Sequence, residues 1–157
     1  MKLGRLNHVG VATPDIDASI AFYRDVMGAS DITEPFVLES QQVRVCFVNT
    51  PGEHGTAGTQ IELLQPTAAD SAVGKWLEKN PLGGQHHICF EVEDIYAARD
   101  EMVVRGAKVL NEPRIGAHGE GAFADDLGAI DARSLPDLSH HRFGISIREL
   151  QRHRAGH

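Results

Sequence analysis

Hydrophobic and polar residues alternate along two separated stretches of the chain, residues 5–12 and 86–92. Side chains that alternate with a period of two line opposite faces of a β-strand, so both stretches are predicted to be strands. The same reasoning predicts strands over 43–48 and 58–65. The Gly-rich segment between these last two has the composition of a turn.

Two other stretches, 13–28 and 67–79, carry apolar residues at helical spacing. The first opens with Thr13 and Pro14 and has acidic residues where a first turn would lie, which favours a helix start. Gly28 ends that pattern, and Asn80-Pro81 ends the second. Strands and helices in this order predict an α+β fold rather than a doubly wound sheet.

The sequence repeats itself once, at an offset of 79 residues. Leu6-Asn7-His8-Val9-Gly10-Val11 aligns with Gln85-His86-His87-Ile88-Cys89-Phe90, and Asp15 aligns with Asp94. A repeat of about half the chain indicates two equivalent modules sharing one structure. We therefore expect a single domain over 1–157, with module one at about 5–66, a linker helix at 67–80 and module two at about 84–151.

Composition and charge narrow the class of protein. The chain has 157 residues, 41% of them hydrophobic, and a net charge of −7. Nucleic-acid binding needs a basic face, so an acidic chain of this kind is not expected to bind nucleic acid. Its apolar runs are too short for a membrane span, and its N-terminus lacks a secretory h-region. We expect a cytoplasmic protein without a membrane partner.

The candidate chemistry lies on the less apolar face of the predicted strands. Alternation places His8 with the small residue Gly10, away from Val9, and it places His87 on the matching face of the repeat. Glu62 points away from the buried side of its own strand by the same rule. Two imidazoles and a carboxylate, without thiolates, suit a divalent metal such as Mn, Co, Ni, Zn or Fe. If the modules curl into a cup, all three groups point into it.

At this point the sequence resembles a known family. The halves are similar to the paired βαβββ modules of the vicinal oxygen chelate (glyoxalase/dioxygenase) superfamily, which form a curved sheet around a metal-binding cup. Within it, methylmalonyl-CoA epimerases are the most similar group. The resemblance covers about residues 5–119. The matching stretches are Leu6-Asn7-His8-Val9-Gly10-Val11, Gln60-Ile61-Glu62-Leu63-Leu64-Gln65-Pro66, Trp76-Leu77-Glu78-Lys79-Asn80-Pro81, Gly84-Gln85-His86-His87-Ile88 and Glu112-Pro113-Arg114-Ile115-Gly116-Ala117-His118-Gly119.

The resemblance implies one divalent metal ion, Co, Mn, Ni or Zn, held by four side chains. Three of the family's ligand positions fall on His8, Glu62 and His87, the last chosen over its neighbour His86 because it is in register with His8. The fourth falls on Glu149, six residues past Phe143 as in the family pattern. Glu149 is also the implied catalytic group that exchanges protons.

The implied activity is that of an isomerase that interconverts (2R)- and (2S)-methylmalonyl-CoA by metal-assisted enolate formation. An acyl-CoA substrate and a homodimer are implied with it. Two departures from the family pattern stand out. Residues 120–142 replace an apolar strand and turn with a longer polar run. Val45 occupies the position where some epimerases carry a second acid/base Glu.

Three alternatives keep the fold but change the function. The first is an isomerase similar to lactoylglutathione lyase, for which the altered segment 120–142 leaves room. The second is a metal-free protein that binds a small molecule in the same cup, against which the inward-facing histidines and glutamate count. The third is an iron dioxygenase with two His ligands and one carboxylate, against which a Glu in both modules argues.

Overall fold

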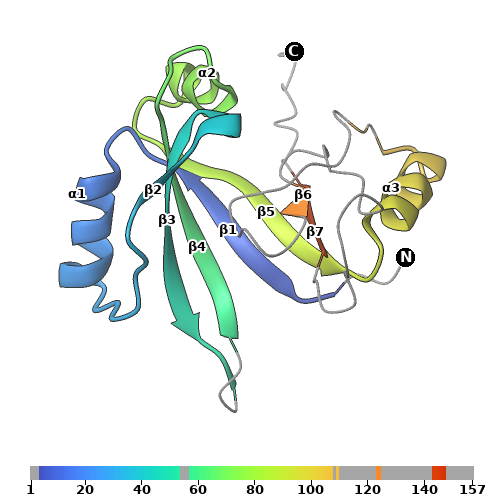
Figure 1. The fold of residues 1–157 in the computed structure, drawn as a ribbon, viewed down its shortest axis with the longest axis horizontal. Coiled ribbons are helices and arrows are strands. Elements are labelled where there is room, and N and C mark those ends of the chain that lie inside the picture. Colours follow the sequence, from blue (N-terminus) through green and yellow to red (C-terminus); the bar gives the residue numbers. More distant parts are fainter. Residues whose placement is uncertain (1–3, 54–56, 108, 110–122, 125–142, 148–157) are drawn as a thin grey trace, which may run out of the picture.

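The structure, a computed structural model, describes residues 4–53, 57–107, 109, 123–124 and 143–147. These residues form one curved sheet in the strand order β2-β3-β4-β1-β5-β7-β6, with helices outside it (Figure 1). The strands are β1 (Leu6–Ala12), β2 (Phe36–Leu38), β3 (Val43–Pro51), β4 (Ala57–Pro66), β5 (Gly84–Val92), β6 (Phe123–Ala124) and β7 (Phe143–Ile147). The helices are α1 (Ile16–Ala21), the π-helix η1 (Phe22–Val26), the 3-10 helix η2 (Glu39–Gln41), α2 (Ala72–Lys79) and α3 (Ile95–Val104). The predicted α+β class is confirmed.

The two repeats meet at the middle of the sheet. Strand β1 opens the first repeat and lies antiparallel to β5, which opens the second. On its other side β1 is parallel to β4, the last strand of the first repeat. The first repeat thus has the order strand, helix and three strands. The second shows β5, α3, β6 and β7 among the described residues. Both first strands therefore lie beside each other, where their side chains can share one site.

Helices α1 and α3 begin in the same way, as expected for a duplicated sequence. The side chain of Asp15 accepts a hydrogen bond from the backbone N–H of Ala18, and Asp94 caps α3 at the repeat-equivalent position. The cap is thus Asp15 itself, and α1 begins just after it. The helix turns into η1 at Phe22, and Met27 is 64% exposed. Met27 is the last apolar position of the predicted helical stretch 13–28, and it is exposed because the π-turn changes the helical period.

Helix α2 begins at Ala72, later than residue 67 where the sequence predicted it. The side chain of Ser71 accepts a hydrogen bond from the backbone N–H of Gly74 and so caps the helix at this point. The backbone N–H of Thr67 donates instead to the carbonyl of Gln42. Short polar residues before the cap favour turns over helix, which explains the shorter helix.

Apolar side chains pack on both faces of the first module. One cluster lies toward α1 and contains Ile16, Cys46, Val48 and Leu63. The other contains Ala12, Val43, Val45, Phe47, Leu64 and Val73, with the half-buried Trp76 packed against it. A third, smaller cluster joins Val92 to Ile95 and Ala98 of α3. The face that carries His8 is therefore a buried face, because Ala12 on the same side of β1 belongs to the second cluster.

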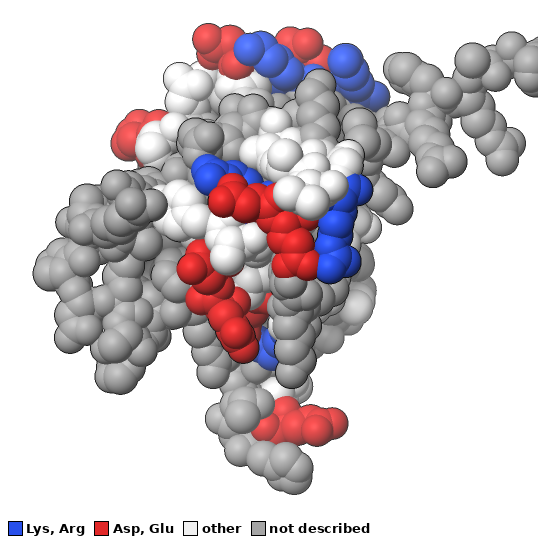
Figure 2. Space-filling model, turned by 90° about the vertical axis from the view of Figure 1, so that its right-hand side faces the viewer, with Lys and Arg blue, Asp and Glu red and all other residues white. Residues whose placement is uncertain are grey.

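Charged side chains of both signs lie on the face of the molecule that Figure 2 draws. On the face drawn in Figure 2, acidic and basic residues lie interspersed among neutral ones within the described part of the chain. Among the helices of that part, none is long and apolar enough to cross a membrane.

Candidate metal centre

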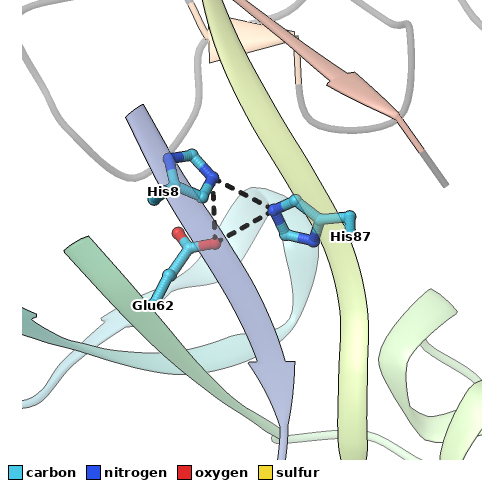
Figure 3. A group of neighbouring side chains, drawn as sticks. All are labelled: His8, Glu62 and His87. Atoms are coloured by element: carbon cyan, nitrogen blue, oxygen red, sulfur yellow. Dashed lines mark hydrogen bonds and ion pairs between the residues drawn. The ribbon is translucent and has the colours of Figure 1, made fainter. Parts of the chain in front are cut away.

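Three of the side chains expected to bind metal converge on one point (Figure 3). His8 comes from β1, Glu62 from β4 and His87 from β5. The Nε2 atoms of the two histidines are 3.1 Å apart. The Oε2 atom of Glu62 lies 3.6 Å from Nε2 of His8 and 3.3 Å from Nε2 of His87. Three electron-pair donors thus face one another.

Strand register produces this convergence. Gly10 in the central strand β1 is paired with Glu62 on one side and with His87 on the other. His8 lies two residues before Gly10, so its side chain leaves the same face of the sheet. A glycine between the two partners leaves room above β1 for the ring of His87. A Cβ on Gly10 would lie 2.1 Å from Cε1 of that ring.

The three side chains of the centre are buried. His8 is 0% exposed, Glu62 is 1% exposed and His87 is 3% exposed. Neither carboxylate oxygen of Glu62 takes part in a hydrogen bond within the described structure. Burying a carboxylate in this way is costly unless a cation or a donor compensates it. The arrangement is therefore one that a bound cation would stabilise.

The donor set fits a divalent metal ion. Ligand bonds of about 2.0–2.2 Å at right or tetrahedral angles place neighbouring ligand atoms about 2.8–3.6 Å apart. The three donor separations, 3.1, 3.3 and 3.6 Å, fall within this range. Imidazole nitrogens and a carboxylate oxygen suit Co, Mn, Ni or Zn. His8, Glu62 and His87 could thus hold one such ion.

Two other positions were singled out in the sequence, Glu149 and Val45. Glu149, the predicted fourth ligand and catalytic group, lies outside the described residues, as does 125–142 within the divergent segment. Val45 is 0% exposed and belongs to the cluster around Phe47, so its position is apolar. In the sequence Gly10 is only a small neighbour of His8. The register of the sheet shows that it lies between Glu62 and His87 on the two adjacent strands.

Comparison with known proteins places the sequence in a family. Residues 7–123 match the Glyoxalase/Bleomycin resistance protein/Dioxygenase superfamily. The chain belongs to this superfamily. The predicted resemblance is therefore confirmed, and the curved sheet of an α+β fold is the architecture that it implied.

Several relatives are epimerases. The chain is 48% identical over 120 residues to the ethylmalonyl-CoA/methylmalonyl-CoA epimerase of Cereibacter sphaeroides. This alignment covers 75% of this chain and 84% of that protein. It is 42% identical over 120 residues to human mitochondrial methylmalonyl-CoA epimerase, covering 76% of this chain and 64% of the human protein. The fold is similar, with a TM-score of 0.68 and 33% identity, to a Streptomyces coelicolor methylmalonyl-CoA epimerase variant in complex with 2-nitronate-propionyl-CoA. That match covers 92% of this chain and 97% of the other.

Proposed function

We propose that this protein is a metal-dependent methylmalonyl-CoA epimerase that interconverts the (2R) and (2S) forms of its thioester substrate. The observation that carries the proposal is the convergence of His8, Glu62 and His87 from the two repeats within 3.1–3.6 Å of one another. The identity to epimerases over three quarters of the chain supports the same substrate class. A metal-free binding protein would have no use for a buried carboxylate facing two imidazole nitrogens.

The reaction removes a proton from the carbon between a thioester carbonyl and a carboxylate, and returns it to the opposite face. A divalent cation, when bound, supplies a Lewis acid that stabilises the negative charge developing on the substrate's oxygens. The chain's own part is to hold that ion rigidly. His8 and His87 would bind the ion through their Nε2 atoms. The carboxylate of Glu62 would compensate part of the charge of the buried divalent ion.

We propose Glu149 as the fourth ligand and as a proton-exchanging group. A carboxylate beside the substrate carbon can accept the proton on one face, and an acid on the other face must return it. Positioned proton transfer of this kind contributes about 10²–10⁴-fold to the rate. The support for Glu149 is its spacing after Phe143 in the sequence. The homodimer, which the family resemblance implies, and the cytoplasmic location, which the sequence favours, both stay predictions.

Solvent deuterium exchange tests the reaction directly. The purified protein, stripped of metal and reloaded with Co²⁺, Mn²⁺, Ni²⁺ or Zn²⁺, is mixed with methylmalonyl-CoA in D₂O, and label at C2 is followed by mass spectrometry. We expect fast labelling that needs the added metal. A second reaction offers the hemithioacetal of glutathione and methylglyoxal. Turnover of this compound alone would overturn the proposal in favour of a lactoylglutathione-lyase-like isomerase.

Substitutions separate the ligands from the rest of the surface. Glu62→Gln, His8→Ala and His87→Ala should each lower metal affinity by more than the about 10–100-fold typical of residues outside the ligand shell. Glu78→Gln makes the same chemical change on the exposed face of α2 and should change neither affinity nor rate. Glu149→Gln should slow deuterium exchange by about 10²–10⁴-fold if it moves the proton. An unchanged rate in Glu149→Gln would remove that residue from the proposal.

A further inference from the structure

Each histidine of the centre has a neighbour in sequence that contacts its other ring nitrogen. Nδ1 of His8 lies 2.9 Å from Oδ1 of Asn7. Nδ1 of His87 lies 3.0 Å from Nδ1 of His86. Asn7 and His86 occupy equivalent positions of the repeat, 79 residues apart. Both are buried, at 7% and 8% exposure.

Two β-bulges place these neighbours where they can reach the rings. The ladder between β1 and β5 pairs Leu6 with Phe90 and then His8 with Cys89, which leaves Asn7 as an extra residue of β1. Further along, Gly10 pairs with His87 and Val11 with Gln85, which leaves His86 as an extra residue of β5. In a regular strand consecutive side chains point to opposite faces, whereas a bulge re-aims one of them. Each repeat therefore has one bulge in its first strand, at the residue just before the histidine of the centre.

The contacts of Asn7 fix which nitrogen of His8 carries the hydrogen. The amide Nδ2 of Asn7 donates to Oε1 of Glu91 at 3.1 Å, and Arg5 donates to the same oxygen at 2.6 Å. A carboxylate paired with a guanidinium accepts hydrogen bonds, so the NH₂ of Asn7 faces Glu91 and its Oδ1 faces His8. An amide oxygen can only accept. Nδ1 of His8 must therefore donate, so the electron pair of its Nε2 faces the centre, where Nε2 of His87 lies 3.1 Å away.

We infer that Asn7 and His86 are positioning residues that hold His8 and His87 in the Nδ1–H form, with both Nε2 electron pairs directed at the metal centre. At the second site the two Nδ1 atoms lie 3.0 Å apart, and the inferred Nδ1–H form of His87 makes Nδ1 of His86 the acceptor. The ring of His86 also packs edge-on against the ring of Trp76, with 5.6 Å between the ring centroids, and this contact restricts its orientation. Partners of this kind orient a metal-ligating ring and fix its tautomer.

The inference rests on the metal centre proposed above, and metal affinity tests it with a matched pair of variants. His86→Asn places an amide oxygen where Nδ1 of His86 lies and copies the Asn-His pair of the first repeat. His86→Leu has about the same size but no acceptor. We expect Co²⁺, measured by competition with a chelator, to bind about 10–100-fold more weakly to His86→Leu than to the parent. His86→Asn should recover most of the affinity, because only the acceptor matters.

The role of Asn7 is tested by measuring which ring nitrogen of His8 is protonated. In metal-free protein labelled with ¹⁵N at histidine, long-range ¹H–¹⁵N correlation spectra report which ring nitrogen is protonated. The signals are assigned with His8→Gln and His87→Gln. We expect Nδ1–H for His8 in the parent, and a shift of His8 toward Nε2–H in Asn7→Leu. Asn49→Ala, which removes a half-buried amide on β3 that bonds to Asp31 and Gln60 and to neither histidine, should leave the tautomer of His8 unchanged.

The outcomes separate this inference from the proposed function. A parent that binds Co²⁺ tightly while His86→Leu binds it equally well overturns the positioning role and leaves the metal centre intact. The positioning role of Asn7 is likewise overturned if His8 is found as Nε2–H in the parent. A parent that binds none of the four metals overturns the proposed centre and this inference with it. Should Asn7→Leu fail to fold, the His86 pair and the parent's tautomers still decide the question.

Discussion

The ring of His87 lies against the α-carbon of Gly10, on the strand next to its own. A Cβ on Gly10 would stand 2.1 Å from Cε1, 2.3 Å from Nδ1 and 2.7 Å from Nε2 of that ring. Rotation of the methyl group moves only its hydrogens and not Cβ, so contacts this short are relieved only if the ring or the backbone shifts. Gly10 is therefore needed for the position of His87, and through it for the metal centre.

Gly10→Ala should displace the ring of His87 and weaken metal binding. A shift of about 1 Å in a reacting group commonly costs about 10²-fold in rate, so we expect epimerase activity to fall by about that factor. The measurement is Co²⁺ affinity together with the rate of deuterium exchange. His87→Ala removes the ring, so in that background Gly10→Ala should cost no further stability. Equal stability losses in both backgrounds would contradict the steric argument.

Glu62→Gln should make the metal-free protein more stable while it abolishes the stabilisation that metal gives. The carboxylate of Glu62 is 1% exposed, and its oxygens take part in no hydrogen bond within the described structure. An amide there could donate to an imidazole nitrogen and is neutral. Removing a buried unsatisfied charge of this kind is worth about 1–3 kcal/mol.

Urea unfolding with and without metal measures both parts of this prediction. In the parent, free metal at 100 times its dissociation constant should add about 2.7 kcal/mol to the free energy of unfolding. Glu62→Gln should show a higher midpoint without metal and no rise on metal addition. A lower midpoint without metal would mean that Glu62 stabilises the fold through contacts beyond the centre.

The pattern of the sequence was sufficient to find the three side chains of the candidate centre. A period of two put His8, Glu62 and His87 on matching faces, and the duplication put His8 opposite His87. The central pairing of β1 with β5 then brought these faces together. Both steps depend on local spacing and on symmetry, which a single sequence carries.

The pattern could not reveal features that depend on how strands pair. Alternation assigns Asn7 and His8 to opposite faces, and only the bulge in the ladder shows that both reach the same centre. The π-helix at Phe22 is similar, since an inserted residue changes the helical period without leaving a signal in hydrophobicity. Residues 125–142 and Glu149 lie outside the described residues, so their predicted roles stay predictions.

Leu63→Ala should destabilise the fold much more than the same change at Leu82. Leu63 is 0% exposed, in the cluster with Ile16 and Cys46 beneath α1, whereas Leu82 is 95% exposed. Truncating a fully buried leucine commonly costs about 2–5 kcal/mol, because a cavity remains. A surface leucine should change the free energy of unfolding by less than about 0.5 kcal/mol. Denaturant unfolding of the two variants makes the comparison, and similar losses would show that the α1 layer contributes little.

The thiol of Cys46 should resist alkylation in the folded protein. Burial raises the pKa of this thiol, and its Sγ donates to the carbonyl oxygen of Thr33 at 3.1 Å. Alkylating reagents attack the thiolate, so a raised pKa leaves less of the reactive form at any given pH, and the packing around Cys46 blocks access. Mass spectrometry after iodoacetamide treatment should find Cys46 unmodified in native protein at pH 8 and fully modified in denaturant, with glutathione as the reactivity standard. Because Cys46 lies in the layer that Leu63→Ala loosens, that variant should label faster than the parent, while Leu82→Ala should label at the parental rate. Labelling of Cys46 in the native parent as fast as glutathione would contradict the packed layer between α1 and the sheet.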